Sequence, residues 1–319
     1  MSDLRNTGPK AEDLAYVRFR APDLDAMQSF LEDFGLTVQR GYSDGGVEAL
    51  FSRGTGGSPY VHITERGEPG FIGLGFKMAS SADLEALAAL DGASNIETIQ
   101  QPGGGQRVRF SDPDGNSVDG VYGIEEFQRL PPDVRPPVNS IATRVRYNNP
   151  IRLKSKRPIP VNRLGHLVLT VSDFKASEAW YQKRFGLIHS EQFYAGEKSA
   201  IIAAFFRTDR GQVPTDHHSV CLAQSANSGV NHVAFEVDDW DSVMIGHDYL
   251  SQRGHVSHWG VGKHVFGSQI FDYWEDPYGN VLEHFTDGDL FDASHVPTLE
   301  PVEALLEVQW GPNPPPKEL

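Results

Sequence analysis

The stretch GKHVFGSQIFDYWEDPYGNVLE places His264, Tyr273 and Glu283 around one tight turn. Two upstream segments with strand-like patterns, LGHLVLTV and VNHVAFEV, each carry one histidine among mostly apolar residues, His166 and His232. Two imidazoles and one carboxylate form a ligand set that is typical of a non-haem Fe(II) centre. The sequence therefore predicts a metal site built from His166, His232 and Glu283.

Separate strands are expected to position these three side chains. The strand period of two puts His166 on one face of LGHLVLTV, while the other face can pack against helices. His232 is placed in the same way, and Glu283 follows the turn in VLEHF. A lone strand histidine is usually a hydrogen-bonded core residue, so the prediction rests on the joint pattern. Three ligands on one octahedral face leave positions for a bidentate substrate and O2.

One pattern recurs along the chain: a strand, a helix ending in Phe-Gly-Leu, then several strands. LAYVRFRAPDLDAMQSFLEDFGLTVQR resembles LGHLVLTVSDFKASEAWYQKRFGLIHS, and a second unit of the same type follows in each half. Each half ends in a hairpin with an Asp-Pro-x-Gly-Asn turn, which begins at Asp112 and at Asp276. These repeats predict an α+β fold of two tandem domains, each with two βαβββ modules that curl into a barrel-like sheet around a cavity.

The two halves differ in the residues that could do chemistry. Where the second half has its first metal histidine, the first half offers Ala15 or Tyr16, and in place of the second histidine it offers Ile72 or Gly73. Of the three ligands, only Glu283 has a counterpart of the same type in the first half, Asp119. One carboxylate without imidazoles is a poor transition-metal site. We therefore expect the first half to be a structural or oligomer-forming copy.

The predicted domain boundaries follow composition. Residues 1–130 form the N-terminal domain without catalytic residues, 131–160 a linker, 161–295 the C-terminal metal-binding domain and 296–319 a tail. The linker contains PPDVRPPVN and a basic stretch, which we interpret as an extended connector lying against an acidic surface rather than as a nucleic-acid arm. The tail packs across a domain or a neighbouring subunit, or stays disordered.

Composition excludes several classes of function. The chain has 319 residues and a net charge of -15, which argues against a nucleic-acid or anionic-membrane surface. No apolar run approaches the length of a membrane span, and the first residues lack the apolar core of an export signal. Cys221 is the only cysteine, so no intrachain disulfide can form and a reducing cytoplasm is expected. A small organic substrate fits this composition better.

At its chemical residues the chain resembles the type I extradiol catechol dioxygenases of the vicinal oxygen chelate superfamily, over nearly its whole length. The family's signature is a histidine followed by a Tyr-x-x-Asp-Pro-x-Gly-x-x-x-Glu run, which reads here as His264, Tyr273, Asp276, Pro277, Gly279 and Glu283. Asp272 departs from the family, which has an apolar residue there, and we expect it to alter pocket polarity without changing the chemistry. The chain is also similar to trihydroxytoluene oxygenases.

This resemblance implies roles for the site residues. The metal held by His166, His232 and Glu283 would be Fe(II), with Mn(II) as the alternative, and O2 would be the co-substrate. The pair His217-His218 stands where the family keeps its acid–base histidine. Periodicity alone does not decide between the two. We assign the role to His218, and interpret its neighbour as a loop residue or one that lies behind the site.

The resemblance further implies that His264 and Tyr273 hydrogen-bond the substrate. The function would be that of an oxidoreductase that inserts both atoms of O2 into a catechol-type ring in the breakdown of aromatic compounds. Substituted catechols, bicyclic dihydroxyarenes and trihydroxytoluenes are all candidate substrates. Residues expected to line an aromatic pocket are Phe193, Tyr194, His258, Trp259, Phe266 and Phe271.

Two alternatives use the same scaffold. A glyoxalase-like metal-dependent isomerase or transferase often has more carboxylate ligands and lacks the His218, His264 and Tyr273 ensemble. A non-enzymatic small-molecule binding protein needs no metal ligands. A fold match alone does not decide among these functions. We also expect a homo-oligomer.

Overall fold

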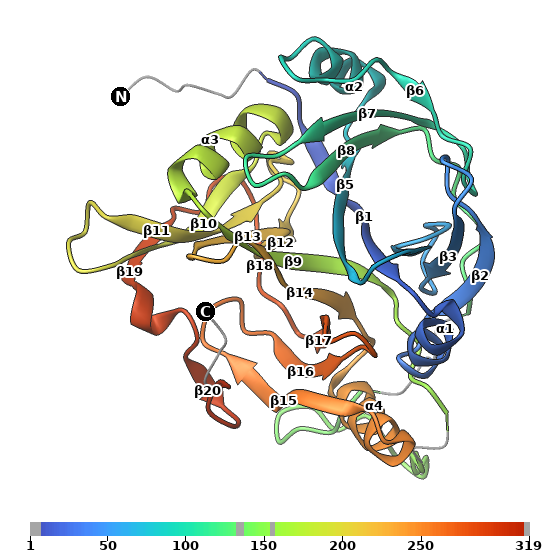
Figure 1. Ribbon diagram of the computed structural model, residues 1–319. Helices are drawn as coiled ribbons and strands as arrows, with labels where there is room; N and C mark the ends of the chain where they lie inside the picture. Colours follow the sequence, from blue (N-terminus) through green and yellow to red (C-terminus); the bar gives the residue numbers. More distant parts are fainter. Residues whose placement is uncertain (1–7, 132–136, 154–156, 316–319) are drawn as a thin grey trace.

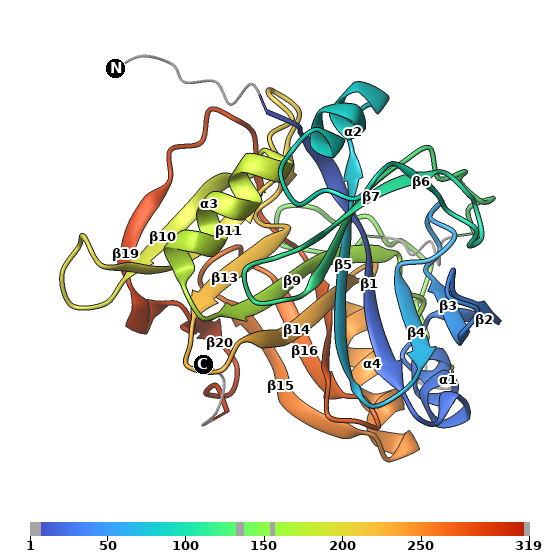
Figure 2. The same ribbon diagram turned by 45° about the horizontal axis from the view of Figure 1, so that its top comes forward.

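Two strongly curled sheets lie side by side, with helices outside the curl (Figures 1 and 2). The computed structural model describes residues 8–131, 137–153 and 157–315. Strand β1 of the first sheet runs beside β9 of the second at the junction of the two halves (Figure 1). The arrangement confirms the α+β class and the curled sheets.

The first sheet has the strand order β2-β3-β4-β1-β5-β8-β7-β6. Its strands are β1 Ala11–Ala21, β2 Thr37–Tyr42, β3 Glu48–Arg53, β4 His62–Arg66, β5 Gly70–Met78, β6 Glu97–Thr98, β7 Gln106–Ser111 and β8 Ser117–Tyr122. Its helices are α1 Leu24–Asp33 and α2 Ser81–Ala88. Strand, helix and three strands therefore occur twice in succession.

The second sheet has the order β19-β10-β11-β13-β9-β14-β17-β16-β15-β20. Its strands are β9 Arg163–Val171, β10 Ile188–Tyr194, β11 Ile201–Arg207, β13 Val220–Gln224, β14 Gly229–Glu236, β15 Val256–His264, β16 Ile270–Glu275, β17 Val281–Thr286, β19 Thr298–Pro301 and β20 Val308–Trp310. The remaining elements are the helices α3 Phe174–Phe185 and α4 Trp240–Arg253, the 3-10 turn η1 Val302–Ala304, and a small ribbon of β12 Thr215–Asp216 with β18 Leu290–Phe291.

The hairpins that end each half have the predicted turn chemistry. Gly115 and Gly279 have φ values of 91° and 81°, in the left-handed region that favours glycine. Asp112 and Asp276 each accept hydrogen bonds from backbone amides within their own turn. Local side-chain bonds of this kind fix the turn, and in the second half they fix the register of β16 and β17, which carry two of the predicted site residues, Tyr273 and Glu283.

A shared apolar core joins the halves. Phe76 of the first sheet stacks on Phe185 of α3 with ring centroids 4.1 Å apart. Phe34, which follows α1, packs edge-on against Phe235 of β14, and its carbonyl lies 2.7 Å from His284 Nε2. The first half therefore supports the outer side of the strands that carry the candidate site.

The linker and the tail differ in secondary structure. Residues 137–153 contain no helix or strand, and Ile141 is 97% exposed, while Lys154 and Lys156 of the basic stretch lie outside the described residues. In contrast, β19 pairs with β10 and β20 pairs with β15, so the tail forms both edges of the second sheet. Its described part packs on its own chain, which is one of the arrangements expected for it.

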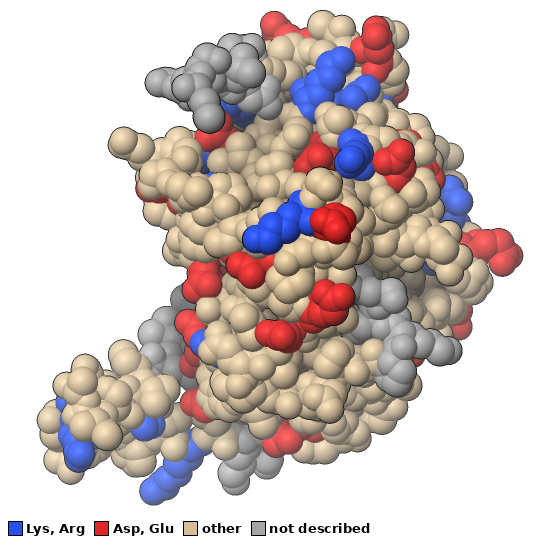
Figure 3. Space-filling model, turned by 90° about the vertical axis from the view of Figure 1, so that its left-hand side faces the viewer, with Lys and Arg blue, Asp and Glu red and all other residues tan. Residues whose placement is uncertain are grey.

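No helix in the described part of the chain is long and apolar enough to cross a membrane. On the face shown in Figure 3, acidic and basic side chains lie interspersed over the body of the molecule, while the lobe that projects at the lower left shows only basic side chains among its coloured residues.

Candidate metal centre

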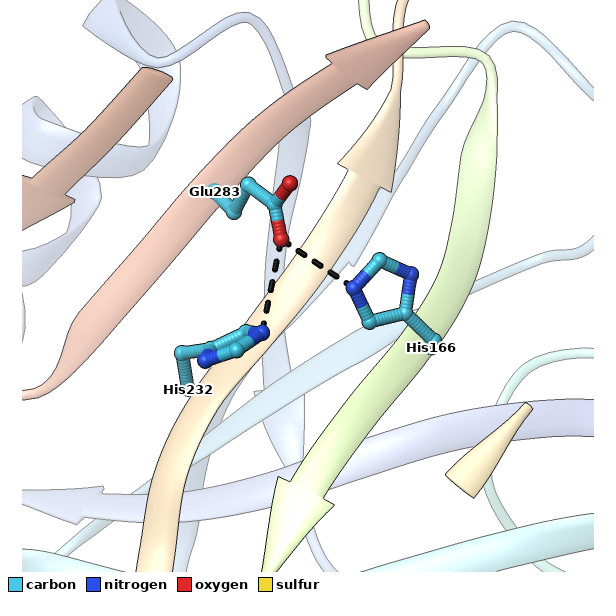
Figure 4. A group of neighbouring side chains, drawn as sticks. All are labelled: His166, His232 and Glu283. Atoms are coloured by element: carbon cyan, nitrogen blue, oxygen red, sulfur yellow. Dashed lines mark hydrogen bonds and ion pairs between the residues drawn. The ribbon is translucent and has the colours of Figure 1, made fainter. Parts of the chain in front are cut away.

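Three adjacent strands bring His166, His232 and Glu283 to one face of the second sheet (Figure 4). Ala234 of β14 pairs with both His166 of β9 and Glu283 of β17, and His232 lies two residues earlier on the same face. Glu283 Oε2 is 3.1 Å from His166 Nε2 and 3.4 Å from His232 Nε2. One candidate ligand atom from each residue lies within 4.8 Å of the others.

Burial controls the charges in this cluster. Glu283 is fully buried, and burial raises the pKa of its carboxyl, while His166 and a hydrogen bond from Tyr273 oppose that rise. Burial also lowers the pKa of His232 well below its ordinary value, and the neighbouring histidines lower it further. Without another cation the site therefore favours uncharged groups.

The donor set fits a divalent transition metal. Glu283 Oε1 and His166 Nδ1 are buried and have no hydrogen-bond partner among the described residues. An unpartnered buried carboxylate oxygen is costly, and coordination is one way in which proteins satisfy it. His232 Nδ1 lies 2.7 Å from Asn231 Oδ1, an acceptor that places the ring proton on Nδ1 and leaves Nε2 free as a ligand atom.

A pocket opens beside the cluster. Among its lining residues are the predicted ligands His166 and His232, and also His218, His264 and Tyr273. Strand β15 supplies His264 and β16 supplies Tyr273, and the imidazole Nε2 lies 2.9 Å from the phenol oxygen. Burial lowers the pKa of His264 to about 3, with His166 and His217 adding to the effect, so its imidazole is neutral. The structure thus brings the predicted catalytic and metal residues to one place.

His218 reaches the cavity because the chain bends before β13. Strand alternation alone would put it on the side of Val220, which belongs to the apolar core, whereas Cys221 lines the cavity. Residues 217–219 are not in a strand, and the bend turns His218 toward His166, with ring centroids 4.2 Å apart. Burial and four neighbouring histidines lower the pKa of His218 well below its ordinary value. The neutral imidazole can act as a base.

The predicted aromatic wall is correct in part. Trp259 and Phe266 line the cavity. Phe193 contacts Phe266, and Phe271 contacts Trp259, so both lie behind the wall. Tyr194 and His258 do not line the cavity, so their prediction as wall residues is wrong.

Sequence reasoning missed apolar wall residues from three places: Val168, Phe205, Leu305 and Leu306. Val168 lies two residues after His166 on the same strand face, a signal that periodicity offers. Leu305 and Leu306 belong to the tail, and only the pairing of β19 and β20 brings them to the site.

Asp272 does not line the cavity, although its charge contributes to the raised pKa of Glu283. It alternates with Tyr273 along β16 and therefore faces the other side of the sheet. Its carboxylate accepts a hydrogen bond from Trp274 Nε1 at 2.6 Å and lies 3.0 Å from His247 Nδ1. The departure from the family pattern serves packing beneath α4.

Comparison with known proteins agrees with this geometry. Residues 163–284 match the model of the Glyoxalase/Bleomycin resistance protein/Dioxygenase superfamily. Metapyrocatechase 2 of Cupriavidus necator is 28% identical over 302 residues, which cover 94% of this chain and 89% of the relative. An iron-dependent extradiol dioxygenase of Rhodococcus jostii is 24% identical over 294 residues, 86% of this chain and 89% of that protein.

Among solved structures, the Mn(II)-bound glyoxalase from Novosphingobium aromaticivorans superimposes with a TM-score of 0.78 at 20% identity, over 98% of this chain and 94% of that one. This match shows the fold. Residues 163–284 thus match a domain of the Glyoxalase/Bleomycin resistance protein/Dioxygenase superfamily, and the chain's sequence relatives carry the names metapyrocatechase and extradiol dioxygenase.

Proposed function

We propose that the chain is an extradiol ring-cleaving dioxygenase whose metal is Fe(II), held by His166, His232 and Glu283. The observation that carries this proposal is a fully buried carboxylate flanked by two imidazole nitrogens in a cavity that also holds His218 and Tyr273. When bound, a ferrous ion supplies a positive charge that favours the catecholate and electrons that can be exchanged with O2.

The protein's own residues account for binding and proton movement. Tyr273 and His264 form a hydrogen-bonded pair at the cavity wall and can hold a substrate oxygen. His218 stands against His166 on the other side and can take a proton from the substrate hydroxyl and later return it. Phe205, Phe266 and the other apolar walls exclude water from the ring.

The cavity lining supports a substrate without a carboxylate. Its polar residues are histidines, a tyrosine, Asn231 and Gln269, and the described lining includes no lysine or arginine. An organic anion buried there would lack a charged partner, which costs several kcal/mol. The apolar side chains of Phe205, Phe266 and Leu305 instead suit an aryl or alkyl substituent. We infer that catechols with uncharged substituents are the substrate class, and bicyclic dihydroxyarenes belong to it.

Oxygen consumption tests the proposed function. Metal-free protein is loaded anaerobically with Fe(II) or Mn(II), and oxygen uptake and product absorbance are followed with alkyl, aryl and carboxylated catechols. We expect uptake only with metal and with uncharged catechols preferred. Absence of uptake with every catechol at full iron loading would contradict the proposal.

The fold match to a glyoxalase supports one alternative, a metal-dependent isomerase. Turnover of a glutathione hemithioacetal under anaerobic conditions would favour that function. The dioxygenase proposal predicts none, because O2 is its co-substrate.

We also propose that the chain forms a homo-oligomer. Val138, Ile141 and Tyr147 of the linker are 65%, 97% and 74% exposed, and large exposed apolar side chains in one segment often mark an interface. Light scattering should give a mass above that of one chain, and Ile141→Asp should lower it. A monomeric wild-type protein would contradict the assembly without affecting the proposed catalytic site.

A further inference from the structure

A buried row of three ionisable side chains runs from the cavity to strand β10. His218 lines the cavity, and its Nδ1 lies 2.8 Å from the Nδ1 of His217. The other nitrogen of His217, Nε2, forms an ion-pair contact with Glu191. Exposed fractions are 3% for His218, 0% for His217 and 7% for Glu191, so water does not replace these contacts easily.

The donors and acceptors in this row determine one another. The contact is a close approach and not an aligned hydrogen bond, because neither His217 Nε2 nor Glu191 Oε2 has a hydrogen-bond partner among the described residues. A carboxylate oxygen so close to the ring repels a lone pair on Nε2 and favours a proton there. If His217 carries a single proton, on Nε2, its Nδ1 is a lone pair, and the 2.8 Å contact requires His218 Nδ1 to carry the donated proton. Nε2 of His218 is left without a proton. That nitrogen is the one available to a substrate hydroxyl.

The surrounding chain holds His217 in place. Its backbone N–H donates to the Asp289 carbonyl at 2.9 Å, and its own carbonyl accepts from the Ser190 hydroxyl at 2.5 Å. The rings of Phe205 and Phe291 lie 5.1 and 5.4 Å from its centroid. The backbone contacts hold the chain at His217, and the two rings pack against its imidazole.

Gly267 and Arg207 complete this support. Gly267 has a φ of 78°, and a Cβ there would lie 3.0 Å from His217 Nδ1. Arg207 binds the Ser190 hydroxyl at 3.0 Å and interacts electrostatically with Glu191. Arg207 thus places a positive charge near the Glu191 carboxylate.

We propose that Glu191 and His217 are positioning residues that hold His218 as the Nδ1–H tautomer and so present Nε2 to the substrate as the base. This inference rests on the proposed function for its catalytic consequence. The alternative is that His217 is a structural core histidine whose ring contacts a nearby carboxylate. The tautomer of His218 would then not depend on Glu191.

The tautomer can be measured without catalysis. Metal-free protein with ¹⁵N-labelled histidine reports which ring nitrogen carries the proton, and comparison with His218→Phe assigns the signals. We expect His218 to be protonated at Nδ1 and bare at Nε2. In Glu191→Leu, which removes the acceptor, the two tautomers should both be populated. A His218 protonated at Nε2 in the wild-type protein would overturn the proposal.

Kinetics of the iron-loaded protein give the second readout. Glu191→Leu should lower kcat by about 10- to 100-fold, part of the effect of general acid–base catalysis, with KM changed less than about threefold. Glu191→Gln keeps an acceptor oxygen and should restore part of the rate. Equal iron content and circular dichroism establish that each variant is folded.

The matched control is Glu178→Leu. Glu178 lies 2.6 Å from His189 Nε2, a similar carboxylate–histidine pair that does not reach the cavity, so its kcat should stay within about twofold. If both variants lose the same activity, or Glu191→Leu loses none, the positioning role is wrong. Absence of ring cleavage in the wild-type protein would instead refute the proposed dioxygenase function. The tautomer measurement would still decide whether Glu191 and His217 position His218.

Discussion

The two halves of the chain hold equivalent strand positions with different side chains. In the second half, Ala234 pairs with both the histidine of β9 and the glutamate of β17. In the first half, Gly75 pairs in the same way with Tyr16 and Asp119, and Gly73 takes the place of the second histidine. The register therefore decides between the alternatives that the sequence left open.

The difference shows how one hairpin serves as scaffold or as site. Asp119 accepts from the Tyr16 hydroxyl at 2.8 Å and from Arg109 Nε at 2.9 Å, and Arg18 lies 3.9 Å away. Two guanidinium groups thus balance its charge. Glu283 contacts imidazoles and has no arginine or lysine ion pair among the described residues. The carboxylate with charged partners stabilises the fold, and the one without them can bind a metal.

Removing a proposed ligand should have the largest effect. His166→Ala leaves two of three protein ligands, and metal affinity should fall by more than about 100-fold, since even residues that only support ligands cost 10–100-fold. Ring cleavage at fixed, sub-saturating Fe(II) should fall in parallel. Activity within tenfold of wild type would mean that His166 is a core histidine.

The equivalent change in the first half should affect stability instead. Asp119→Asn removes the charge that Arg109 and Arg18 face, and should lower the free energy of unfolding by about 2–3 kcal/mol. This is less than the ~3–5 kcal/mol for a fully buried pair, because the Arg109 side chain is 35% exposed. Urea unfolding measures it, and a loss under about 0.5 kcal/mol would show that the network contributes little.

His62, a buried histidine of the first half, should make the free energy of unfolding depend on pH. The size of this effect should be similar to that of Asp119→Asn or smaller. Burial lowers the pKa of His62 to about 3 from 6.5, so the unfolded chain takes up a proton that the folded chain does not. Stability is therefore lost as pH falls below 6.5. His62→Phe should reduce the stability difference between pH 7 and pH 5 by about 2 kcal/mol. An unchanged difference in urea unfolding at the two pH values would refute this assignment.

The contact that ties the halves together should give the smallest effect. Asp33 of α1 lies 2.9 Å from both Arg253 Nε and His255 Nε2 in the second half. Burial raises the pKa of Asp33, but these hydrogen bonds outweigh it and the pKa is lowered. The stabilisation that this contact gives is present above the ordinary pKa of an aspartate, and it is lost as pH falls through the lowered pKa of Asp33. Asp33→Asn should cost about 1 kcal/mol at pH 7 and little at pH 3.

The architecture was predictable because its signals are local. Phe-Gly-Leu helix ends and Asp-Pro-x-Gly-Asn turns recur at matching places, and period-two patterns put His166 and His232 on inward faces. The convergence of His166, His232 and Glu283 followed from the repeat. Their roles as metal ligands stay a proposal.

Tertiary features were less accessible to sequence reasoning. The position of His218 in the cavity depends on a bend that interrupts the alternation of side chains along the strand. Leu305 reaches the cavity only because the tail pairs with distant strands. The contact between His217 and Glu191 joins residues from different strand connections, and no spacing rule relates them. Such contacts depend on how a sheet curls, which periodicity does not specify.

The iron content of a matched pair of variants shows whether Glu283 is a metal ligand and Asp119 is not. Glu283→Gln and Asp119→Asn make the same chemical change at equivalent positions, and each purified protein is loaded anaerobically with Fe(II), desalted and analysed by mass spectrometry for iron per chain. We expect about one iron per chain in the wild type and Asp119→Asn, and almost none in Glu283→Gln. Iron retained at wild-type stoichiometry in Glu283→Gln, or lost in Asp119→Asn despite normal folding, would contradict this assignment.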